Sequence, residues 1–492
     1  MSNSLKILDN EQSLNGESPF LKPLKKDNNA EHPRALRSLS KIIDGGLCHR
    51  CGSCVGICPT GVLSLDSESY PKVENLSSCT DCDLCVKVCP GDELNLVEHY
   101  KEFHGKEPEL TNTHGDFLEA IIGYSNYHGL REGSTSGGIV TAVLLHMLET
   151  KQIDGAVVIA SDPEALWRGK PIIARTKEEI LSAVKSKYAI SPTNSVFKEI
   201  REVKGKYALV GLPCQIHGYH KAAALDKKLK ERVVLTVGLF CHAAIEHEAF
   251  RVIWDSLGDK VNGAKSFVSR VGKHPGSPQL ELADGSFYPV YFGNKQGFKP
   301  SSMEIINVLY RLYTPKRCLT CFDALSEMAD ISVGDPWMAP PEDDVDFHQG
   351  WSFALIRSKR GQAAIKEMRE ADLIHARDLT HKEAKSCNHE MSTEKRWRAF
   401  RMIETQKRQG KSIPDYGNFE VPRHTGKKFL TTERNIFTHI LCFVPSFRKP
   451  VLKFFLGNGG YIILWLNNKR RNLKFYIRDN YVRIKRKYSG RK

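Results

Sequence analysis

The sequence CHRCGSCVGICP, from Cys48 to Pro59, recurs as CTDCDLCVKVCP from Cys79 to Pro90. Each run has the spacing CxxCxxCxxxCP, which is the ligand pattern of bacterial [4Fe–4S] clusters. The two runs supply thiolates for two cubane clusters, and a chain that holds two such clusters transfers electrons.

The spacing also predicts which cysteine binds which cluster. Three closely spaced thiolates reach three irons of one cube, but the fourth iron faces away and needs a ligand from a distant turn. In two-cluster proteins the fourth cysteine of each run therefore ligates the other cluster. One cluster is predicted on Cys48, Cys51, Cys54 and Cys89, and the second on Cys79, Cys82, Cys85 and Cys58. Zinc would leave ligands over and disulfides would imply a secreted scaffold, so both are disfavoured.

Two short apolar runs at residues 62–66 and 70–73 lie between the cysteine blocks, around a polar turn, and predict a hairpin. The segment from Leu47 to Gly91 resembles bacterial-type dicluster ferredoxins. We therefore expect an α+β, ferredoxin-like dicluster domain at residues 41–100.

The chain has 492 residues, which is too long for one ferredoxin, so the clusters serve a larger downstream domain. Residues 1–40 are polar and charged, without the apolar stretch of a secretory signal, and are expected to be a disordered lead-in. Cysteines in cluster spacing favour a reducing compartment, so we expect a cytoplasmic protein.

The formal net charge of +15 comes from the C-terminal part. Residues 401–492 hold 22 Lys plus Arg and 5 Asp plus Glu, which leaves 50 basic and 52 acidic residues in the rest of the chain. Apolar and basic stretches alternate within this basic C-terminal extension. The apolar ones are residues 436–444, 451–456 and 461–466, and the basic ones are residues 469–471 and 483–487.

None of these apolar stretches approaches the roughly 18 residues that a membrane span requires. The interleaved pattern suits a segment that lies on an anionic membrane surface, peripherally at its inner face. A solvated basic appendix that packs some apolar groups on the enzyme body explains the pattern too. Nucleic acid would use the same charges, but no recognition motif is visible, so it is disfavoured.

Between residues 111 and 400 the pattern changes to apolar runs that alternate with helical periodicity. Buried strands are predicted at residues 156–160, 207–211, 233–240 and 353–356, and helices at residues 139–148, 215–225 and 244–257. Alternation of this kind predicts an α/β domain with a mainly parallel sheet.

A run of small residues, Arg131-Glu-Gly-Ser-Thr-Ser-Gly-Gly138, comes directly before the helix expected from Ile139. Open backbone N–H groups at a helix start favour an anion, so this run is a candidate phosphate cradle. An ordinary helix cap would use the same residues.

Four further cysteines are spread along this domain. Cys214 and Cys241 follow predicted strands, and Cys318 and Cys321 form a CxxC pair. Ends of parallel strands meet at one edge of a sheet, so a loop can bring the pair to the other two and complete a third four-thiolate site. Zinc and iron are both compatible with the spacing, as is burial of Cys214 and Cys241 in the core. Cys387 and Cys442 have no partners in spacing and are expected to be structural.

Residues 329–337 predict a short strand that ends in a turn with Asp335 and Trp337 at its tip. The Asp335 carboxylate could position a cofactor ring or a substrate hydroxyl. An ordinary end of a strand is an equally good interpretation.

Together these motifs resemble the beta subunit family of coenzyme F420 hydrogenases and dehydrogenases. The matching stretches follow the family's order through nearly all of residues 111–335, and comprise residues 131–138, 141–142, 154–158, 187–188, 211–216, 240–241, 317–323 and 330–337.

The resemblance implies that residues 111–400 form an FAD-binding domain with its own [4Fe–4S] cluster. The iron ligands would be Cys214, Cys241, Cys318 and Cys321. The cofactor-binding residues would be Ser134, Ser136, Gly137, Gly138, Lys187 and Tyr188, together with Asp335. A dicluster ferredoxin fused to such a domain looks like the electron-input subunits of F420H2 dehydrogenases. Chlorophyllide-type reductases that use ferredoxin are similar in the same domain.

F420 exchanges a hydride, whereas each cluster carries one electron, and only a flavin between them can accept a pair and release single electrons. The sequence thus predicts an oxidoreductase that passes electrons from flavin through the body cluster and the two ferredoxin clusters to a redox partner or ferredoxin, or in reverse. No nucleophile or general base is needed. His217, His220 and His242 could relay a proton, although a structural role is the stronger expectation for each.

Two other functions fit the same sequence. One is a ferredoxin-driven flavin reductase of another organic substrate, such as a membrane-associated intermediate of envelope polysaccharide synthesis. The other is a non-catalytic electron-transfer subunit of a larger enzyme.

Overall fold

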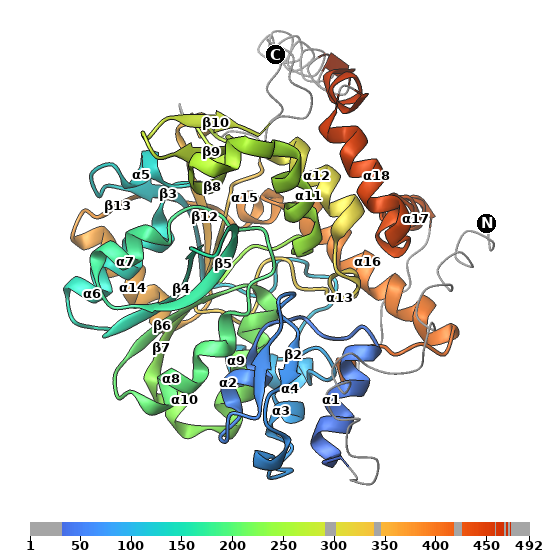
Figure 1. Ribbon diagram of the computed structural model, residues 1–492. Helices are drawn as coiled ribbons and strands as arrows, with labels where there is room; N and C mark the ends of the chain where they lie inside the picture. The colour runs from blue at the N-terminus through green and yellow to red at the C-terminus, as the bar shows by residue number, and fades with distance from the viewer. Residues whose placement is uncertain are drawn as a thin grey trace.

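The computed structural model describes residues 32–290, 302–338, 346–417, 426–457, 459–466, 469–470 and 473. The N-terminal domain lies against a larger α/β body, and the helices that follow residue 425 lie on the outside of that body (Figure 1). Residues 1–31 of the predicted disordered lead-in lie outside the described residues, as do the basic run at residues 483–487 and Arg471.

The N-terminal domain contains a hairpin between its cysteine runs, as predicted. Strand β1 (Leu63–Leu65) pairs antiparallel with β2 (Pro71–Val73), and Leu63 lies opposite Val73. The other elements are α1 (Arg34–Asp44), α2 (Ser53–Ile57), η3 (Leu76–Ser78), α3 (Leu84–Lys87) and α4 (Leu96–His104).

Helix α1 corrects the expectation that residues 1–40 are all disordered. Its apolar side chains Ala35, Leu36, Leu39 and Ile42 recur at helical spacing and are buried beside the cysteines of this domain. Burial of that face stabilises the helix, so residues 34–40 are ordered.

The body is built on an eight-stranded sheet with the order β13-β3-β12-β11-β7-β6-β4-β5. Its strands are β3 (Glu119–Ser125), β4 (Gly155–Asp162), β5 (Ala165–Ala174), β6 (Tyr207–Gly211), β7 (Val233–Leu239), β11 (Ile331–Gly334), β12 (Ser352–Ile356) and β13 (Ile374–Asp378). Strands β11, β7, β6 and β4 are parallel, whereas the pairs at both margins are antiparallel. The sheet is therefore mixed, because β5 follows β4 through a turn too short for a parallel crossover.

Alternate residues of the central strands face two different layers. Val158 and Val210 pack with α6 (Ile139–Glu149) and α14 (Lys359–Glu370). Val157 and Leu209 pack on the opposite face, with α9 (Pro213–Leu225) and with Ile57 and Val88 of the N-terminal domain. The cysteine-rich domain is thus part of the same hydrophobic core as the sheet.

The remaining body elements connect or cover this sheet. The helices are α5 (Leu130–Gly133), α7 (Lys177–Ser182), η4 (Thr193–Val196), α8 (Phe197–Glu202), α10 (Lys227–Arg232), α11 (His247–Leu257), η5 (Gly258–Gly263), α12 (Ser302–Tyr313), α13 (Lys316–Leu319), η6 (Phe347–Gln349), α15 (His381–Ser386) and α16 (His389–Arg408). A second, antiparallel sheet of β8 (Ala264–Val271), β9 (Ser277–Leu282) and β10 (Phe287–Pro289) was not predicted.

The described part of the C-terminal extension is mainly helical, apart from residues 411–417. It contains α17 (Gly426–Thr438), η7 (Ile440–Phe443), α18 (Pro445–Leu456) and a helix at residues 459–466. Within the described part of the chain, none of the helices has the length and apolar character needed to span a bilayer.

Candidate metal centres and cofactor site

Three groups of four cysteines lie in or beside the N-terminal domain. We name them the first tetrad (Cys48, Cys51, Cys54, Cys89), the second tetrad (Cys58, Cys79, Cys82, Cys85) and the body tetrad (Cys214, Cys241, Cys318, Cys321). None of these cysteines forms a disulfide.

The first tetrad brings the fourth cysteine of the second run to the first run. A cavity beneath helix α1 is lined by Cys48, Cys51, Cys54 and Cys89. Burial, and then the negative charge of Cys89, raise the pKa of Cys48 to about 12. Cys89 thus lies where the crossed ligand scheme places it.

The second tetrad is the reciprocal group and is closer to solvent. Burial, and then the nearby charge of Cys58, raise the pKa of Cys85 to about 12. Burial alone would raise the pKa of Cys58 too, but backbone N–H groups of Thr60 and Val62 donate to its sulfur, so the pKa is lowered. Cys82 is exposed.

The body tetrad assembles from the ends of two strands and a loop. Cys214 opens helix α9 directly after β6, Cys241 follows β7, and Cys318 lies in α13. Burial raises the pKa of Cys214 well above its usual value, and the charges that add to this come from Cys51 and from the other three cysteines of its tetrad. The four cysteines are therefore neighbours.

Contacts between the tetrads show the order in which they lie in space. Burial is the largest cause of the raised pKa of Cys214 in the body tetrad, and the charge of Cys51, in the first tetrad, is the next. Burial also raises the pKa of Cys54, and charges that add to it include Cys85 of the second tetrad. Arg317, next to Cys318, also donates to the carbonyls of the two residues after Cys89, so the first tetrad lies between the other two.

The donor sets fit iron–sulfur clusters. Each tetrad supplies four free thiols, and buried thiolates require compensating positive charge, which iron provides. Backbone donors are also in place, since the Arg50 N–H lies 3.3 Å from the Cys48 sulfur. Among the described residues, no three His, Cys, Asp or Glu side chains converge closely enough to hold a single metal ion.

Arg317 connects the first tetrad with the body tetrad and was missed as a functional residue. Its side chain is buried and donates to the carbonyls of Pro90, at 3.3 Å, and Gly91, at 3.1 Å, directly after Cys89. It also donates to the Thr320 hydroxyl, at 3.0 Å, beside Cys321. The only sequence signal was its position next to Cys318.

Lys395 of helix α16 is a second buried cation that the sequence did not indicate. Its Nζ donates to the carbonyls of Cys241, at 2.7 Å, and Asp323, at 2.6 Å. Burial opposes its charge, but the thiolate charges of Cys321 and Cys241 outweigh burial and raise the pKa of Lys395. The cation offsets the negative charge of the body tetrad.

The three histidines that were candidates for proton relay all have structural partners. His217 Nε2 lies 3.0 Å from Asp323 Oδ2, and His220 Nε2 lies 2.7 Å from the Met328 carbonyl. His242 lies 3.3 Å from Arg398. His242 directly follows Cys241, and His217 and Asp323 lie three and two residues from Cys214 and Cys321.

The glycine-rich loop at residues 131–138 packs tightly on the sheet. Gly138 has φ +79° at the start of α6, and a Cβ on Gly137 would lie 2.3 Å from the Gly123 carbonyl. Both glycines thus have a packing role, as the ordinary-cap interpretation requires. Ser136 donates to the Trp351 carbonyl, whereas Ser134 Oγ is buried and has no hydrogen-bond partner among the described residues.

The other predicted cofactor residues approach this loop from two sides. The Ser186 N–H donates to Thr135 Oγ1 at 2.9 Å, which brings Lys187 and Tyr188 to the loop. Burial, with the nearby charge of Lys185, lowers the pKa of Lys187 to about 8. Lys187 Nζ donates to the carbonyls of Ala183 and Val184, at 3.0 Å each. Two half-buried lysines on a segment that contacts the glycine-rich loop fit an anionic group such as a diphosphate.

Asp335 joins Tyr188 through Arg270, which the sequence did not indicate. Arg270 Nη1 pairs with Asp335 Oδ2 at 2.6 Å, and the same guanidinium hydrogen-bonds Tyr188. Tyr188 packs against the apolar cluster that contains Tyr310, and the Tyr310 ring lies 5.2 Å from the ring of His242, the residue after Cys241. Tyr188 and Asp335 therefore lie on the side of the body that carries the body tetrad.

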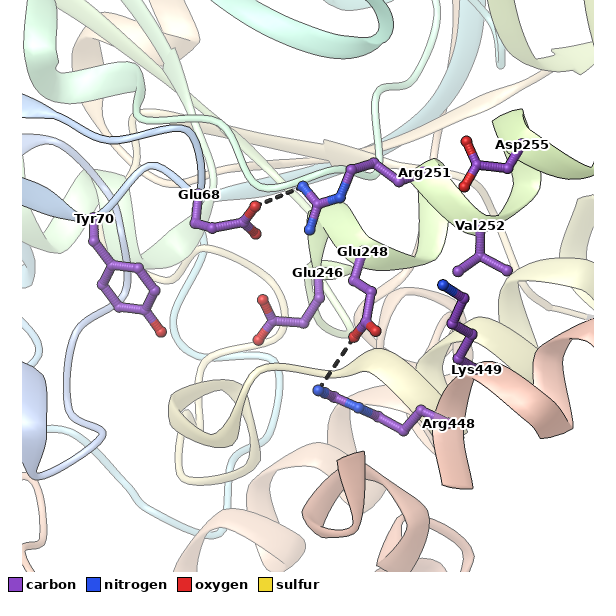
Figure 2. A pocket seen from close by; sticks show the side chains of 9 residues that line it. All are labelled: Glu68, Tyr70, Glu246, Glu248, Arg251, Val252, Asp255, Arg448 and Lys449. Carbon is purple, nitrogen blue, oxygen red and sulfur yellow. Dashed lines mark hydrogen bonds and ion pairs between the residues drawn. The ribbon is translucent and has the colours of Figure 1, made fainter. Parts of the chain in front are cut away.

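A cavity of about 500 Å³ lies apart from these residues, between the β1–β2 turn, α11 and α18. Figure 2 shows its charged lining, in which Arg251 pairs with Glu68 at 2.5 Å and Arg448 pairs with Glu248 at 3.3 Å. These pairs join the N-terminal domain and the C-terminal extension to the same helix of the body.

Three family models match the chain. They are the coenzyme F420 hydrogenase/dehydrogenase beta subunit N-terminal model at residues 120–198, its C-terminal model at residues 204–382, and a 4Fe-4S dicluster domain at residues 40–90.

Two curated relatives have names that include coenzyme F420. The chain is 27% identical to a coenzyme F420-dependent sulfite reductase of Methanocaldococcus jannaschii over 66% of its own length, and it spans only 46% of that protein. It is 28% identical to a coenzyme F420 hydrogenase subunit beta of Methanococcus voltae, over 54% of this chain and 86% of the relative. Among solved structures, a chain of the F420-reducing [NiFe] hydrogenase complex of Methanosarcina barkeri matches with a TM-score of 0.48 and 23% identity, covering 62% of this chain and 97% of that chain.

Proposed function

The chain belongs to the coenzyme F420 hydrogenase/dehydrogenase beta subunit family and carries a 4Fe-4S dicluster domain, and on this premise we propose that it is an iron–sulfur flavoprotein oxidoreductase. It transfers electrons between a hydride-exchanging substrate and a one-electron redox partner. Coenzyme F420 is the first candidate for the substrate, because the names of the relatives include it.

The observation that carries this proposal is the row of three cysteine tetrads. Cys214 neighbours Cys51, and Cys54 neighbours Cys85, so the body, first and second tetrads follow one another. The predicted cofactor residue Tyr188 lies on the side of the body that carries the body tetrad. A third [4Fe–4S] cluster on the body tetrad would complete a conductor from the cofactor site to the exposed Cys82.

FAD, when bound, accepts a hydride as an electron pair and exchanges single electrons with iron–sulfur clusters. Ser134 and Lys187 would hold its diphosphate, and Tyr188 and Asp335 are placed by Arg270. Lys395 and Arg317 hold positive charge beside the buried thiolates, which stabilises the body and first clusters.

Anaerobic purification with quantification of iron, sulfide and flavin tests the cofactor content. We expect about twelve irons and one FAD per chain, since each cubane holds four irons. The variant Cys214→Ser should lose about four of these irons and keep the dicluster signal. Cys387→Ala is the matched control, because Cys387 is a buried cysteine outside the three tetrads and should lose none.

Titration with reduced F420 then tests the substrate. We expect anaerobic bleaching of the bound flavin, followed by reduction of the clusters. If only reduced ferredoxin or dithionite bleaches the flavin, F420 is not the donor and the rival flavin reductase of another organic substrate replaces it. If no donor gives turnover without a partner protein, the chain is an electron-transfer subunit.

A further inference from the structure

The C-terminal extension exposes large apolar side chains on two consecutive helices. We define its outer apolar face as Phe447, Phe454, Ile462, Ile463, Trp465 and Leu466, whose exposed fractions lie between 38% and 59%. The two helices are continuous at this face, because the ring of Phe454 lies against Gly459. A water-facing helix normally presents polar residues outward, so this exposure calls for an explanation.

The opposite side of the same helices is firmly packed. Leu452 and Leu464 are buried in one core cluster with α11 and α12. Arg448 pairs with Glu248 of α11 at 3.3 Å, and its guanidinium lies 5.2 Å from the centre of the Tyr313 ring. The outer face is therefore exposed on helices that are already docked on the body.

Basic side chains accompany the outer apolar face. Lys449, Lys453, Lys469 and Arg470 are exposed, and Lys469 Nζ lies 5.0 Å from the centre of the Trp465 ring. Residues 445–473 contain no Asp or Glu. Aromatic and aliphatic groups interleaved with uncompensated positive charge are the pattern of a segment that lies in the interface of an anionic bilayer.

We propose that the outer apolar face binds an anionic lipid bilayer peripherally, with the aromatic and aliphatic side chains in the interface and the lysines against lipid phosphates. This inference is independent of the reaction that the clusters support. Charge favours lipid over a second copy of the chain, because two copies would bring the same positive faces together.

Vesicle flotation with the full holoprotein tests the proposal. The protein should float with phosphatidylcholine vesicles that contain phosphatidylglycerol, and at least about tenfold less with phosphatidylcholine alone or at high salt. The tryptophan emission should shift to shorter wavelength on binding, and Trp465→Phe should remove most of that shift.

Two variants separate the charged from the apolar contribution. Lys453→Glu with Lys469→Glu should weaken partitioning by at least about tenfold. Ile462→Ser with Ile463→Ser should weaken it by about tenfold as well. The matched controls change equally exposed residues of the body, Lys227→Glu with Lys366→Glu and Leu118→Ser with Leu225→Ser, and should partition as the parent does.

Iron content and light scattering accompany every variant, so that misfolding is detected separately. The proposal is overturned if the parent does not float with anionic vesicles, or if the control variants lose binding equally. It is also overturned if the isoleucine variant converts a dimer to a monomer while vesicle binding is absent, because the face would then join two copies.

Discussion

The first and second tetrads have the same cysteine spacing but different surroundings. Cys51 and Cys89 of the first are buried and its other two cysteines are half-buried, and the buried cation Arg317 lies beside that tetrad. Cys82 of the second is exposed, and backbone N–H groups lower the pKa of Cys58. Because burial and hydrogen bonds tune cluster potentials, we expect the same motif to provide an internal relay in one place and a surface contact in the other.

Removal of one cysteine from each tetrad is the strongest test of this difference. Both Cys51→Ser and Cys82→Ser should lose about four irons. Cys51→Ser should also abolish electron transfer from the flavin to any acceptor at the surface, because the first tetrad lies between the other two. Cys82→Ser should still reduce a small artificial acceptor, as measured with viologen dyes.

Equal activity of both variants with the viologen would contradict the proposed difference between the two tetrads. Equal and complete loss would likewise remove the distinction between relay and surface contact. Iron content must be measured in the same preparations.

Replacement of Arg317 tests the buried surroundings of the first tetrad. Arg317→Met should destabilise the fold by about 3–5 kcal/mol, because buried thiolates lose a compensating cation and two carbonyls lose their donor. The first and body clusters should become harder to reduce. Arg317→Lys should restore part of both effects, measured by thermal unfolding and redox titration.

Arg34→Met is the control near the second tetrad. Arg34 is exposed and pairs with Asp83, so its loss should change stability by less than about 1 kcal/mol. If Arg34→Met shifted a cluster's redox potential as much as Arg317→Met does, the proposed difference between the surroundings of the first and second tetrads would be contradicted.

The affinity of the predicted cofactor site for FAD should depend on pH through Lys187. Its pKa is lowered to about 8 by burial, so its positive charge is present below pH 8 and is lost as the pH rises through that value. A bound diphosphate keeps the lysine protonated, so the dissociation constant of FAD should rise about tenfold per pH unit above 8.

Fluorescence titration of flavin-free protein measures this dependence. Lys187→Met should bind FAD more weakly and flatten the profile, whereas Lys177→Met, an exposed lysine of α7, should keep it. A profile that is unchanged in Lys187→Met would remove Lys187 from the cofactor site.

The smallest effect is expected from the hydroxyl beside Cys58. Thr60 Oγ1 lies 3.8 Å from the Cys58 sulfur, while backbone N–H groups supply the stronger contacts. Thr60→Val should therefore lower the potential of the second cluster only slightly and leave the iron content unchanged, as followed by redox titration. Loss of iron would show that the hydroxyl is needed for cluster binding.

The sequence indicated the parts of the molecule whose pattern is local. The β1–β2 hairpin and strands β4, β6, β7 and β12 lie where the apolar runs predicted them, and the dicluster domain was correctly recognised. The antiparallel margins of the sheet and the sheet of β8, β9 and β10 were missed, because strand direction depends on pairing between distant segments.

The prediction of the site residues was limited in the same way, because it depended on local patterns. Cysteine spacing indicated all three tetrads, but the charges that serve them come from far along the chain. Lys395 reaches Cys241 from helix α16, and Arg270 joins Asp335 to Tyr188 from a strand of the unpredicted sheet. A single Lys or Arg has no spacing signal, so only the folded structure identifies it.

Paramagnetic resonance of the dithionite-reduced protein, combined with iron counting, tests the row of clusters most directly. We predict about twelve irons and mutually interacting reduced clusters, with about four irons and the interaction between body and first clusters lost in Cys214→Ser. Eight irons with one zinc in the parent, and an unchanged spectrum in Cys214→Ser, would contradict the account.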